Sequence, residues 1–222
     1  MLSAEKYRYG LIGYPIGHSQ SPSLFNELCE GRWKYDLLEY DNFEDSWRAF
    51  ADGPYKAVNV TAPYKTLAAG RADIRSEAVR RIGAANILVK TPEGIAAHNS
   101  DFLAVRELLG QAGAKSVTVI GLGGAGRAAL AAAENLGLPV RGLHHDEIAE
   151  GVTDDVIIYT LPCAAPGCDR LACRAIIEAN YKNPCLAEHN GYISGQEWLR
   201  AQARLGFAIL TGQGPAEAGG TL

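Results

Sequence analysis

Two serines stand two positions apart in a rigid segment near the start of the chain. Residues 13–22 read Gly-Tyr-Pro-Ile-Gly-His-Ser-Gln-Ser-Pro and follow an apolar run at residues 9–13. In an extended stretch, side chains two positions apart share a face, so the hydroxyls of Ser19 and Ser21 would point the same way. Two such hydroxyls suit a ligand carboxylate. Alternatively, Ser21 caps a helix whose first residue is Pro22.

A lysine and an aspartate follow, each close to the end of a further strand. Residues 59–65 read Asn-Val-Thr-Ala-Pro-Tyr-Lys and end a short apolar strand. Ligands of open α/β sheets bind at such strand ends, where Lys65 either directs its ammonium into the crevice or is a solvated surface charge. Asp101 ends the string His98-Asn-Ser-Asp. It caps the helix that follows or acts as a catalytic carboxylate, and the two roles are compatible.

A glycine-rich string indicates a nucleotide site. Residues 121–126 read Gly-Leu-Gly-Gly-Ala-Gly, follow the β-branched run 116–120 and open an alanine-rich stretch. This is the G-x-G-x-x-G pattern in its required context, in which glycines let the backbone meet a pyrophosphate at a helix N-terminus. The candidates are Gly121, Gly123, Gly124, Ala125 and Gly126. The alternative is a turn that serves strand–helix packing alone.

The end of the next strand carries the residues that would read the ribose. Residues 143–146 are Leu-His-His-Asp. Asp146 would accept a bond from a ribose 2′-hydroxyl and so favour NAD. His144, His145 or Arg141 would instead meet a 2′-phosphate and so favour NADP. The residues alone leave both cofactors open.

These residues need a scaffold in which strands and helices alternate. Apolar patterning predicts strands at 7–13, 35–40, 57–60, 116–120, 140–144, 155–161 and 207–211, a hairpin at 86–98, a further segment at 184–188, and helices at 22–30, 43–51, 101–113, 127–136, 171–180 and 195–205. Such alternation predicts an α/β fold with parallel sheets. Residues 144–155 are too few for a crossover helix and another strand, so we expect an outer strand–helix unit to be missing. We expect the domain boundary within the helix around 102–114.

Bulk properties exclude several classes of function. The 222 residues carry a formal net charge of −4, and the pI is near 5.8, which argues against a nucleic-acid surface. Apolar stretches are too short for a membrane span, and the first residues lack the core of a secretory signal, so we expect a cytoplasmic protein. Cys163, Cys168 and Cys173 recur every fifth residue without a CxxC pair. We expect free thiols and no metal site.

Taken together, five strings resemble the shikimate dehydrogenase family. They are residues 15–22, 59–65, 83–86, 99–101 and 121–126, in the family's order and at close to its spacing. The resemblance implies an N-terminal substrate-binding and catalytic α/β domain at 1–104. It also implies a Rossmann-like nicotinamide-dinucleotide domain at 105–222, which lacks an edge strand–helix unit and most of the family's C-terminal helix.

The resemblance also implies roles for single residues. Ser19 and Ser21 would hold the substrate carboxylate, Thr61, Asn86 and Asp101 would contact ring hydroxyls, and Lys65 and Asp101 would form the catalytic pair. The expected reaction is reversible reduction of 3-dehydroshikimate to shikimate with NADP(H), in aromatic amino acid and chorismate biosynthesis. Lys65 would protonate the alkoxide that hydride transfer leaves. The expected partner is this small molecule, for a monomer or homodimer.

Two regions depart from the family pattern. His144 and His145 stand where the family has an Asn-Arg-Thr string that binds the 2′-phosphate of NADP. Near the C-terminus the family glutamine is not in register, and Gln213 is a stand-in. NAD therefore stays open beside NADP. The alternatives are a redox-impaired protein that binds a shikimate-like or quinate-like ligand, and an NAD-dependent quinate/shikimate dehydrogenase.

Overall fold

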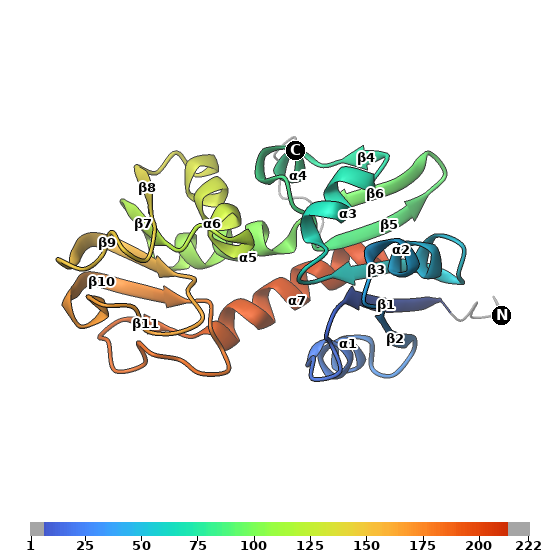
Figure 1. The fold of residues 1–222 in the computed structure, drawn as a ribbon, viewed down its shortest axis with the longest axis horizontal. Helices are drawn as coiled ribbons and strands as arrows, with labels where there is room; N and C mark the ends of the chain where they lie inside the picture. The colour runs from blue at the N-terminus through green and yellow to red at the C-terminus, as the bar shows by residue number, and fades with distance from the viewer. Residues whose placement is uncertain (1–6, 213–222) are drawn as a thin grey trace. The chain divides into compact units, whose positions relative to one another are not determined.

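The computed structural model describes residues 7–212, and its backbone contacts divide the chain into two compact units (Figure 1). The first unit takes in the described residues up to Ser100 together with those from Ala203 onwards, and the second is Asp101–Gln202. Each unit has its own sheet flanked by helices. The expected α/β class is therefore confirmed.

The first unit is built on a six-stranded mixed sheet. Its strands are β1 (Arg8–Gly13), β2 (Lys34–Glu39), β3 (Tyr55–Val60), β4 (Ile74–Arg75), β5 (Ile87–Thr91) and β6 (Gly94–His98), in the order β2-β1-β3-β5-β6-β4. β1 pairs in parallel with β2 and with β3, whereas β5 runs antiparallel to both β3 and β6. β5 and β6 form the predicted hairpin. The carboxyl ends of β1 and β3 consequently lie side by side.

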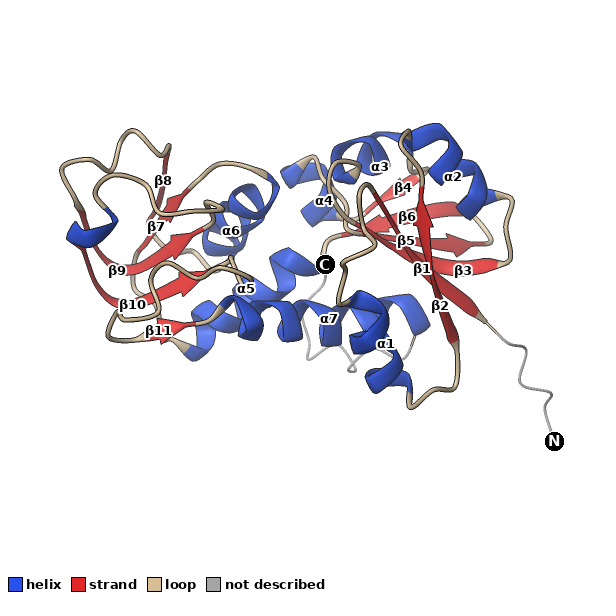
Figure 2. Ribbon diagram, turned by 60° about the horizontal axis from the view of Figure 1, so that its bottom comes forward, coloured by secondary structure: helices blue, strands red, loops and turns tan. Residues whose placement is uncertain are grey.

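Each face of this sheet is covered by a different set of helices (Figure 2). Val58 and Val60 pack with residues of α2 (Phe43–Ala51), α3 (Lys65–Arg71) and α4 (Glu77–Ile82). Ala57 faces the other way and packs with Phe25 of α1 (Ser21–Cys29) and Leu210 of α7 (Gly195–Thr211). Because successive side chains of β3 point to opposite faces of the sheet, the unit has a core on both faces.

The second unit has a five-stranded sheet in which all strands are parallel. The strands are β7 (Val117–Ile120), β8 (Val140–Leu143), β9 (Val152–Tyr159), β10 (Leu171–Glu178) and β11 (Tyr192–Ile193), in the order β11-β10-β9-β7-β8. The helices are α5 (Ser100–Gln111), which begins at the unit boundary, α6 (Gly124–Asn135) and the first part of α7. α6 packs on β7, β8 and β9.

Connecting segments, rather than helices, cover the other face of this sheet. Ile120, Ile157 and Tyr159 pack there against Ile148 and Leu186, which belong to the segments after β8 and after β10. β8 is the edge strand, and residues 144–151, which lead to β9, contain no helix. Residues 160–170, which lead to β10, contain only the short 3-10 turn η1 (Cys168–Arg170).

The helix expected at 171–180 is wrong, because these residues form β10. Leu171, Ala172, Arg174 and Glu178 are tolerated in helices, and this composition suggested one. In the structure β10 lies between β9 and β11, and Ala175, Ile176, Ile177 and Glu178 are all buried. Burial on both faces removes the alternation that marks a half-exposed strand, so tertiary packing decided the outcome.

The strand expected at 207–211 is also wrong, because α7 continues to Thr211. Phe207 and Leu210 are spaced as one helical stripe and pack with Tyr9 and Phe25 in the first unit. Gly206 lets this helix pack closely on β5, since a Cβ at position 206 would lie 3.2 Å from Ile87 Cδ1. The last part of α7 therefore belongs to the first unit, whereas the sequence analysis placed all residues after 104 in the second.

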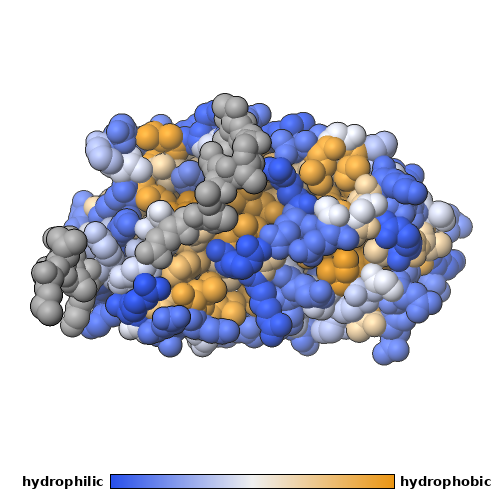
Figure 3. Space-filling model, turned by 180° about the vertical axis from the view of Figure 1, so that it is seen from behind, coloured by the Kyte–Doolittle hydropathy of each residue, from blue (hydrophilic) through white to orange (hydrophobic). Residues whose placement is uncertain are grey.

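On the face drawn in Figure 3, apolar side chains form separate patches between hydrophilic ones. The large apolar residues that are exposed come from many different elements, namely Tyr7, Tyr14, Leu37, Tyr40, Leu67, Ile74 and Leu136. Within residues 7–212, no helix has the length and apolar character that crossing a membrane requires.

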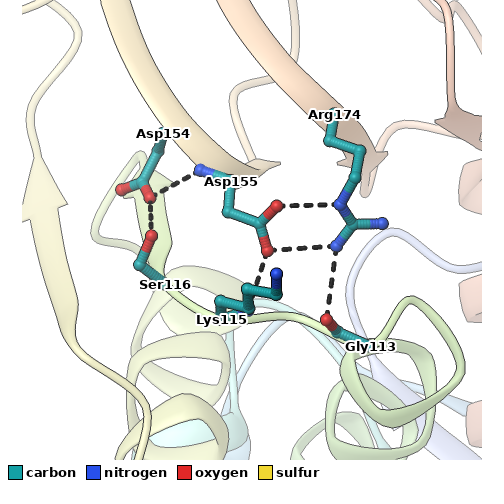
Figure 4. A network of polar contacts seen from close by, with 6 residues as sticks. All are labelled: Gly113, Lys115, Ser116, Asp154, Asp155 and Arg174. Carbon is teal, nitrogen blue, oxygen red and sulfur yellow. Dashed lines mark hydrogen bonds and ion pairs between the residues drawn. The ribbon is translucent and has the colours of Figure 1, made fainter.

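A charged network ties β9 and β10 of the second unit to the segment that precedes β7 (Figure 4). Arg174 on β10 makes two hydrogen bonds with Asp155 on β9, at 2.8 and 3.0 Å, and a third with the carbonyl of Gly113 at 3.4 Å. Asp155 also accepts from the Lys115 backbone N–H at 2.8 Å. Arg174, followed by the Lys115 bond, lowers the pKa of Asp155 to about 2.

We expect Asp155→Asn to destabilise the protein in a pH-dependent way. The lowered pKa means that the charged form of Asp155 stabilises the fold above its unfolded pKa of about 4, and that this contribution is lost as the pH falls towards 2. The variant should therefore melt below wild type at about pH 7, and the gap should close on acidification. Calorimetric melting curves test this. Exposed Asp146→Asn is the control, and an equal deficit at every pH would contradict the assignment.

Candidate functional site

The loops that follow β1 and β3 lie against each other at the carboxyl edge of the first sheet. The Thr61 N–H donates to the carbonyl of Ile12 at 2.9 Å, and the Tyr14 N–H donates to the carbonyl of Ala62 at 3.2 Å. Gly13 permits this approach, because a Cβ there would lie 2.4 Å from the Thr61 methyl carbon. The segment with the two serines thus begins beside Thr61.

Ser19 ends a turn and Ser21 begins α1, so the two serines do not share an extended stretch. The Ser19 N–H donates to the carbonyl of Ile16 at 2.9 Å, and the Ser21 N–H donates to Ser19 Oγ at 3.2 Å. Glu39, the last residue of β2, accepts from the Ile16 N–H at 3.2 Å and holds the loop. α1 begins at Ser21 and its N-cap residue is Gln20, so the interpretation of Ser21 as the cap is wrong.

Behind the serines, a tyrosine and an asparagine continue the polar side chains across the sheet. The Tyr35 hydroxyl on β2 donates to Asn59 Oδ1 on β3 at 2.8 Å. Burial raises the pKa of Tyr35 far above its ordinary value, and the nearby Ser21 hydroxyl offsets part of this effect. The phenol therefore remains a protonated donor at neutral pH.

Asn86 connects this chain of side chains to the start of α5. Its Oδ1 accepts from the Ser100 N–H at 2.7 Å, and its Nδ2 donates to Ser100 Oγ at 3.0 Å. The Asn86 carbonyl accepts from the Val60 N–H at 2.8 Å and from Asn59 Nδ2 at 3.4 Å. Asn86 and Ser100 are 3% and 0% exposed, so these bonds satisfy buried polar groups that would otherwise be costly. We call Tyr35, Asn59, Asn86 and Ser100 the polar relay.

The remaining predicted substrate residues surround the relay or lie outside the described part. Lys65 begins α3, and its carbonyl accepts from the Ala85 N–H at 2.9 Å, which places its backbone beside the residue before Asn86. Asp101 follows Ser100 in the first turn of α5, so it lies inside the helix rather than at its cap. Thr61 and Lys65 are half-buried. Gln213 lies outside the described residues.

The glycine string of the second unit forms a tight turn between β7 and α6. Gly121 has a φ of +90°, which favours glycine, and a Cβ there would lie 2.6 Å from Thr160 Oγ1. A Cβ on Gly126 would lie 1.8 Å from the carbonyl oxygen of Gly121. The Thr160 hydroxyl completes the turn by donating to that same oxygen at 2.8 Å. Side chains at positions 121 and 126 would thus prevent the turn.

The start of α6 suits a pyrophosphate. Gly123 is the N-cap residue, and Gly124, Ala125 and Gly126 form the first turn, where backbone N–H groups lack partners within the helix. A Cβ at Gly123 or Gly124 would meet no atom within 4 Å, so the backbone there is open to an approaching ligand. These residues therefore fit a dinucleotide phosphate, through backbone donors and the positive end of the helix dipole.

His144 and His145, which are expected to meet a 2′-phosphate, are exposed just after β8. The Gly121 N–H donates to the Leu143 carbonyl at 2.9 Å, so the end of β8 adjoins the glycine turn. The backbone N–H of His144 already has a partner, because it donates to the Glu147 carboxylate at 2.6 Å. Arg141 has its Nε on Thr118 Oγ1 at 2.9 Å and is therefore engaged within the sheet.

Cysteines of the second unit serve packing and hydrogen bonding. All five cysteines of the chain are free thiols. Burial is the main cause that raises the pKa of Cys173 to about 11 and that of Cys185 to about 12, so both remain thiols at neutral pH. In the described part of the chain, no group of three or more His, Cys, Asp or Glu residues has the arrangement of a metal site.

Comparisons with known proteins match both units. The family model for the shikimate dehydrogenase substrate-binding domain matches residues 11–88. A shikimate dehydrogenase (NADP(+)) of Acidiphilium cryptum is 36% identical over 63% of this chain and 54% of its own length. Another, from Anaeromyxobacter dehalogenans, is 29% identical over 93% of this chain and 80% of its own length. The chain belongs to the shikimate dehydrogenase family. The expected family is thus confirmed.

The fold of this shikimate dehydrogenase family member extends to solved structures. Shikimate 5-dehydrogenase from Thermus thermophilus, crystallised with NADP(H) and shikimate, aligns with a TM-score of 0.79. The alignment covers 94% of this chain and 95% of that one at 23% identity, so it shows a shared fold. The chain spans about half the length of the Acidiphilium relative and 80% of the Anaeromyxobacter one.

Sequence reasoning missed several residues of this family member's site. Asn59 stood inside the quoted string 59–65, and its position two residues before Thr61 placed it at the same strand end. Tyr35 and Glu39 were harder to find in the sequence, because both lie close to the ends of the predicted strand 35–40, where polar residues are common. Thr160 depends on a contact between distant segments, which only the fold reveals, whereas Glu147 bonds to a backbone N–H three residues before it.

We expect Gly126→Ala to disrupt the glycine turn. The added methyl would overlap the Gly121 carbonyl oxygen, so the strand and helix must separate, and overpacking of this kind costs about 1–3 kcal/mol of unfolding free energy. Affinity for NADP(H) should fall with it. Urea unfolding and cofactor fluorescence titrations measure the two effects. Gly110→Ala, on α5 where a Cβ meets nothing within 4 Å, is the control. Unchanged cofactor affinity in Gly126→Ala would contradict the assignment.

Proposed function

We propose that this protein is a shikimate dehydrogenase, which interconverts 3-dehydroshikimate and shikimate with NADP(H). The observation that carries the proposal is the polar relay, which gathers hydroxyl and amide groups at the carboxyl edge of the first sheet beside Thr61 and Lys65. Family membership and the glycine turn of the second unit support it. The relatives matched are named as NADP(+)-dependent enzymes.

In this proposal the first unit binds the substrate. Ser19 and Ser21 hold the carboxylate through their hydroxyls, and Thr61 and Asn86 contact ring hydroxyls. Asn86 uses one N–H and its Oδ1 on Ser100, which leaves it a second N–H for a ligand. Gln213 is a further candidate for substrate contact. A ligand with one carboxylate and several hydroxyls matches this set of donors and acceptors.

Lys65 and Asp101 complete the chemistry. The nicotinamide, when bound, supplies the hydride that reduces the ring ketone. Lys65 gives a proton to the oxygen of the former ketone, and in the oxidative direction its neutral amine takes that proton back. Asp101 orients the ammonium and accepts a bond from the substrate hydroxyl. In total, the reduction adds one hydride to the carbon of the ring ketone and one proton to its oxygen.

The glycine turn and the end of β8 would hold the cofactor. Gly121, Gly123, Gly124, Ala125 and Gly126 form the cradle for the pyrophosphate, and His144 and His145 lie where a 2′-phosphate would be read. The ring N–H of an exposed imidazole would donate a hydrogen bond to such a phosphate. NADP(H) is the proposed cofactor on this basis.

The second candidate function is a ligand-binding protein with impaired redox activity. The observation in its favour lies in the second unit, where the described connections β8–β9 and β9–β10 hold no α-helix and Glu147 occupies the backbone N–H of His144. Mixing the protein with shikimate and NADP+ and following the absorbance of reduced nicotinamide separates the two. Turnover supports the dehydrogenase. Saturable shikimate binding without turnover supports the binding protein.

We expect Lys65→Met to lower kcat by about 10²–10⁴-fold, because it removes the group that transfers the proton. Affinity for shikimate, measured by calorimetry, should change far less, since the carboxylate and hydroxyl contacts remain. Lys34→Met alters an exposed lysine on β2 and is the matched control. A Lys65→Met enzyme with wild-type kcat would show that another group transfers the proton.

We expect the double substitution His144→Ala and His145→Ala to raise KM for NADP(H) about tenfold, the loss of one charge-assisted bond. KM for NAD(H) should stay unchanged, because that cofactor lacks the 2′-phosphate. Parallel losses for both cofactors would mean that the histidines do not read the phosphate.

A further inference from the structure

The order of strands in the second sheet indicates where the two halves of a dinucleotide would lie. From β7 the chain continues to β8 on one side and then returns to β9 on the other, so the strand order reverses between β7 and β9. Ligands of such sheets bind in the crevice at this switch point, outside the carboxyl ends of the strands. The glycine turn after β7 would take the pyrophosphate, and the end of β8 the adenosine half. The nicotinamide half would therefore face the ends of β9 and β10.

The loops that follow β9 and β10 start side by side. The Ala179 N–H donates to the carbonyl of Tyr159 at 2.8 Å, so the two strands end at the same level. In the loop after β9, Thr160 bonds to the glycine turn, and the buried Tyr159 hydroxyl donates to the carbonyl of Cys163 at 2.8 Å. The Glu178 carboxyl group holds the loop after β10 by accepting from a backbone N–H at 2.8 Å. Each loop thus has its own anchor on the sheet.

The side chain of Asn180 joins the two loops. Its Nδ2 donates to the carbonyl of Pro162, in the loop after β9, and to the carbonyl of Asn183, in its own loop, both at 2.8 Å. Its Oδ1 accepts from the N–H groups of Lys182 and Asn183, both at 3.2 Å. Because carbonyls only accept and N–H groups only donate, these four bonds fix the orientation of the amide. We call the Asn180 side chain with these four bonds the amide clamp.

The amide clamp acts where no α-helix supports the loops. Residues 160–170 contain only the 3-10 turn η1, and residues 179–191 contain no helix. Segments with little regular structure open at a small cost in free energy, so a bond between two of them limits the positions that both can take. The separation of the loops after β9 and β10 therefore depends on Asn180.

We propose that Asn180 is a positioning residue for the nicotinamide half of the cofactor. It acts by holding the loops after β9 and β10 at one separation, rather than by contact with the reacting atoms. Hydride transfer requires a near-attack arrangement of the two carbons, and a misplacement of about 1 Å can cost about a hundredfold in rate. Loops that are clamped keep the ring in that arrangement. This inference rests on the proposed function, because it takes NADP(H) as the ligand of the second unit.

Two substitutions remove the amide clamp in different ways. Asn180→Asp keeps the size of the side chain but turns an oxygen onto the two carbonyls, whereas Asn180→Ala removes the amide without adding charge. Both should weaken NADP+ binding, measured by calorimetry, about threefold to tenfold, the worth of one hydrogen bond. Affinity for 2′,5′-ADP, which represents the adenosine half of the cofactor, should stay at the wild-type value. Asn190→Asp, at an exposed residue of the same connection, is the control.

The rate of hydride transfer gives a second measure of the same effect. In a single turnover of NADP+ with shikimate, followed by stopped-flow absorbance, both variants should transfer hydride about tenfold more slowly than wild type. Affinity for shikimate alone should not change, because the first unit binds it. A role in the fold alone would lower the amplitude of this phase, which counts active molecules, rather than its rate.

Three results would overturn the inference. One is NADP+ affinity and a hydride-transfer rate that stay at wild-type values in both variants. Another is an equal loss of affinity for NADP+ and for 2′,5′-ADP, which would mean that Asn180 supports the whole unit. The third is a loss in Asn180→Asp alone, which would assign the effect to charge. A wild-type protein that fails to bind NADP+ would instead overturn the proposed function, so the two failures are distinguishable.

Hydrogen exchange of the wild-type protein decides the case if neither variant folds. The N–H groups of Lys182 and Asn183 donate to Asn180 Oδ1, so their exchange reports on opening of the amide clamp. NADP+ should slow this exchange, and 2′,5′-ADP should not. Exchange at these two positions that NADP+ leaves unchanged would overturn the inference.

Discussion

The hydrogen bonds of one buried asparagine hold the polar edge of the first sheet together. Asn86 uses its side chain on both the N–H and the hydroxyl of Ser100, and its backbone on Val60 and His98. Its carbonyl also sets the orientation of Asn59, and through it the donor direction of Tyr35. Because Asn86 and Ser100 are buried, each bond lost between them would leave an unpaired polar atom. Asn86 therefore gives β3 and the start of α5 fixed partners.

In the second unit, hydrogen bonds hold loops in place rather than helices. Loops cover one face of its sheet, and a buried carboxyl group organises one of them. Glu178, at the end of β10, is 0% exposed and accepts from the N–H of Cys185 at 2.8 Å and from the Tyr192 hydroxyl at 3.0 Å. The Cys185 thiol donates to it as well, at 3.1 Å, and burial followed by this bond raises the pKa of that thiol to about 12. Hydrogen bonds to a buried carboxyl group thus fix a loop where no helix packs.

Sequence patterns predicted the glycine turn, the hairpin β5–β6 and the rigid segment with Ser19 and Ser21, because each depends on residues that are close together in the sequence. Gly121 and Gly126 are needed for backbone reasons that their spacing alone displays. β10 was mistaken for a helix because its burial arises from β9 and β11, which no local pattern reveals. The end of α7 was mistaken for a strand because Phe207 packs on Tyr9 and Phe25, far away in the chain. The polar relay was not predicted for the same reason, since its bonds join residues from four separate segments.

The central claim is that the carboxyl edge of the first sheet binds a hydroxylated ring carboxylate through the two serines and the relay behind them. Titration calorimetry of shikimate into the wild-type protein, with Asn86→Ala and the shikimate methyl ester in parallel, tests it most directly. The account predicts saturable binding at one site per chain, much weaker binding by the Asn86→Ala protein, and weaker binding of the ester than of the acid. Equal affinity for acid and ester, or no binding of shikimate to the folded protein, would contradict it.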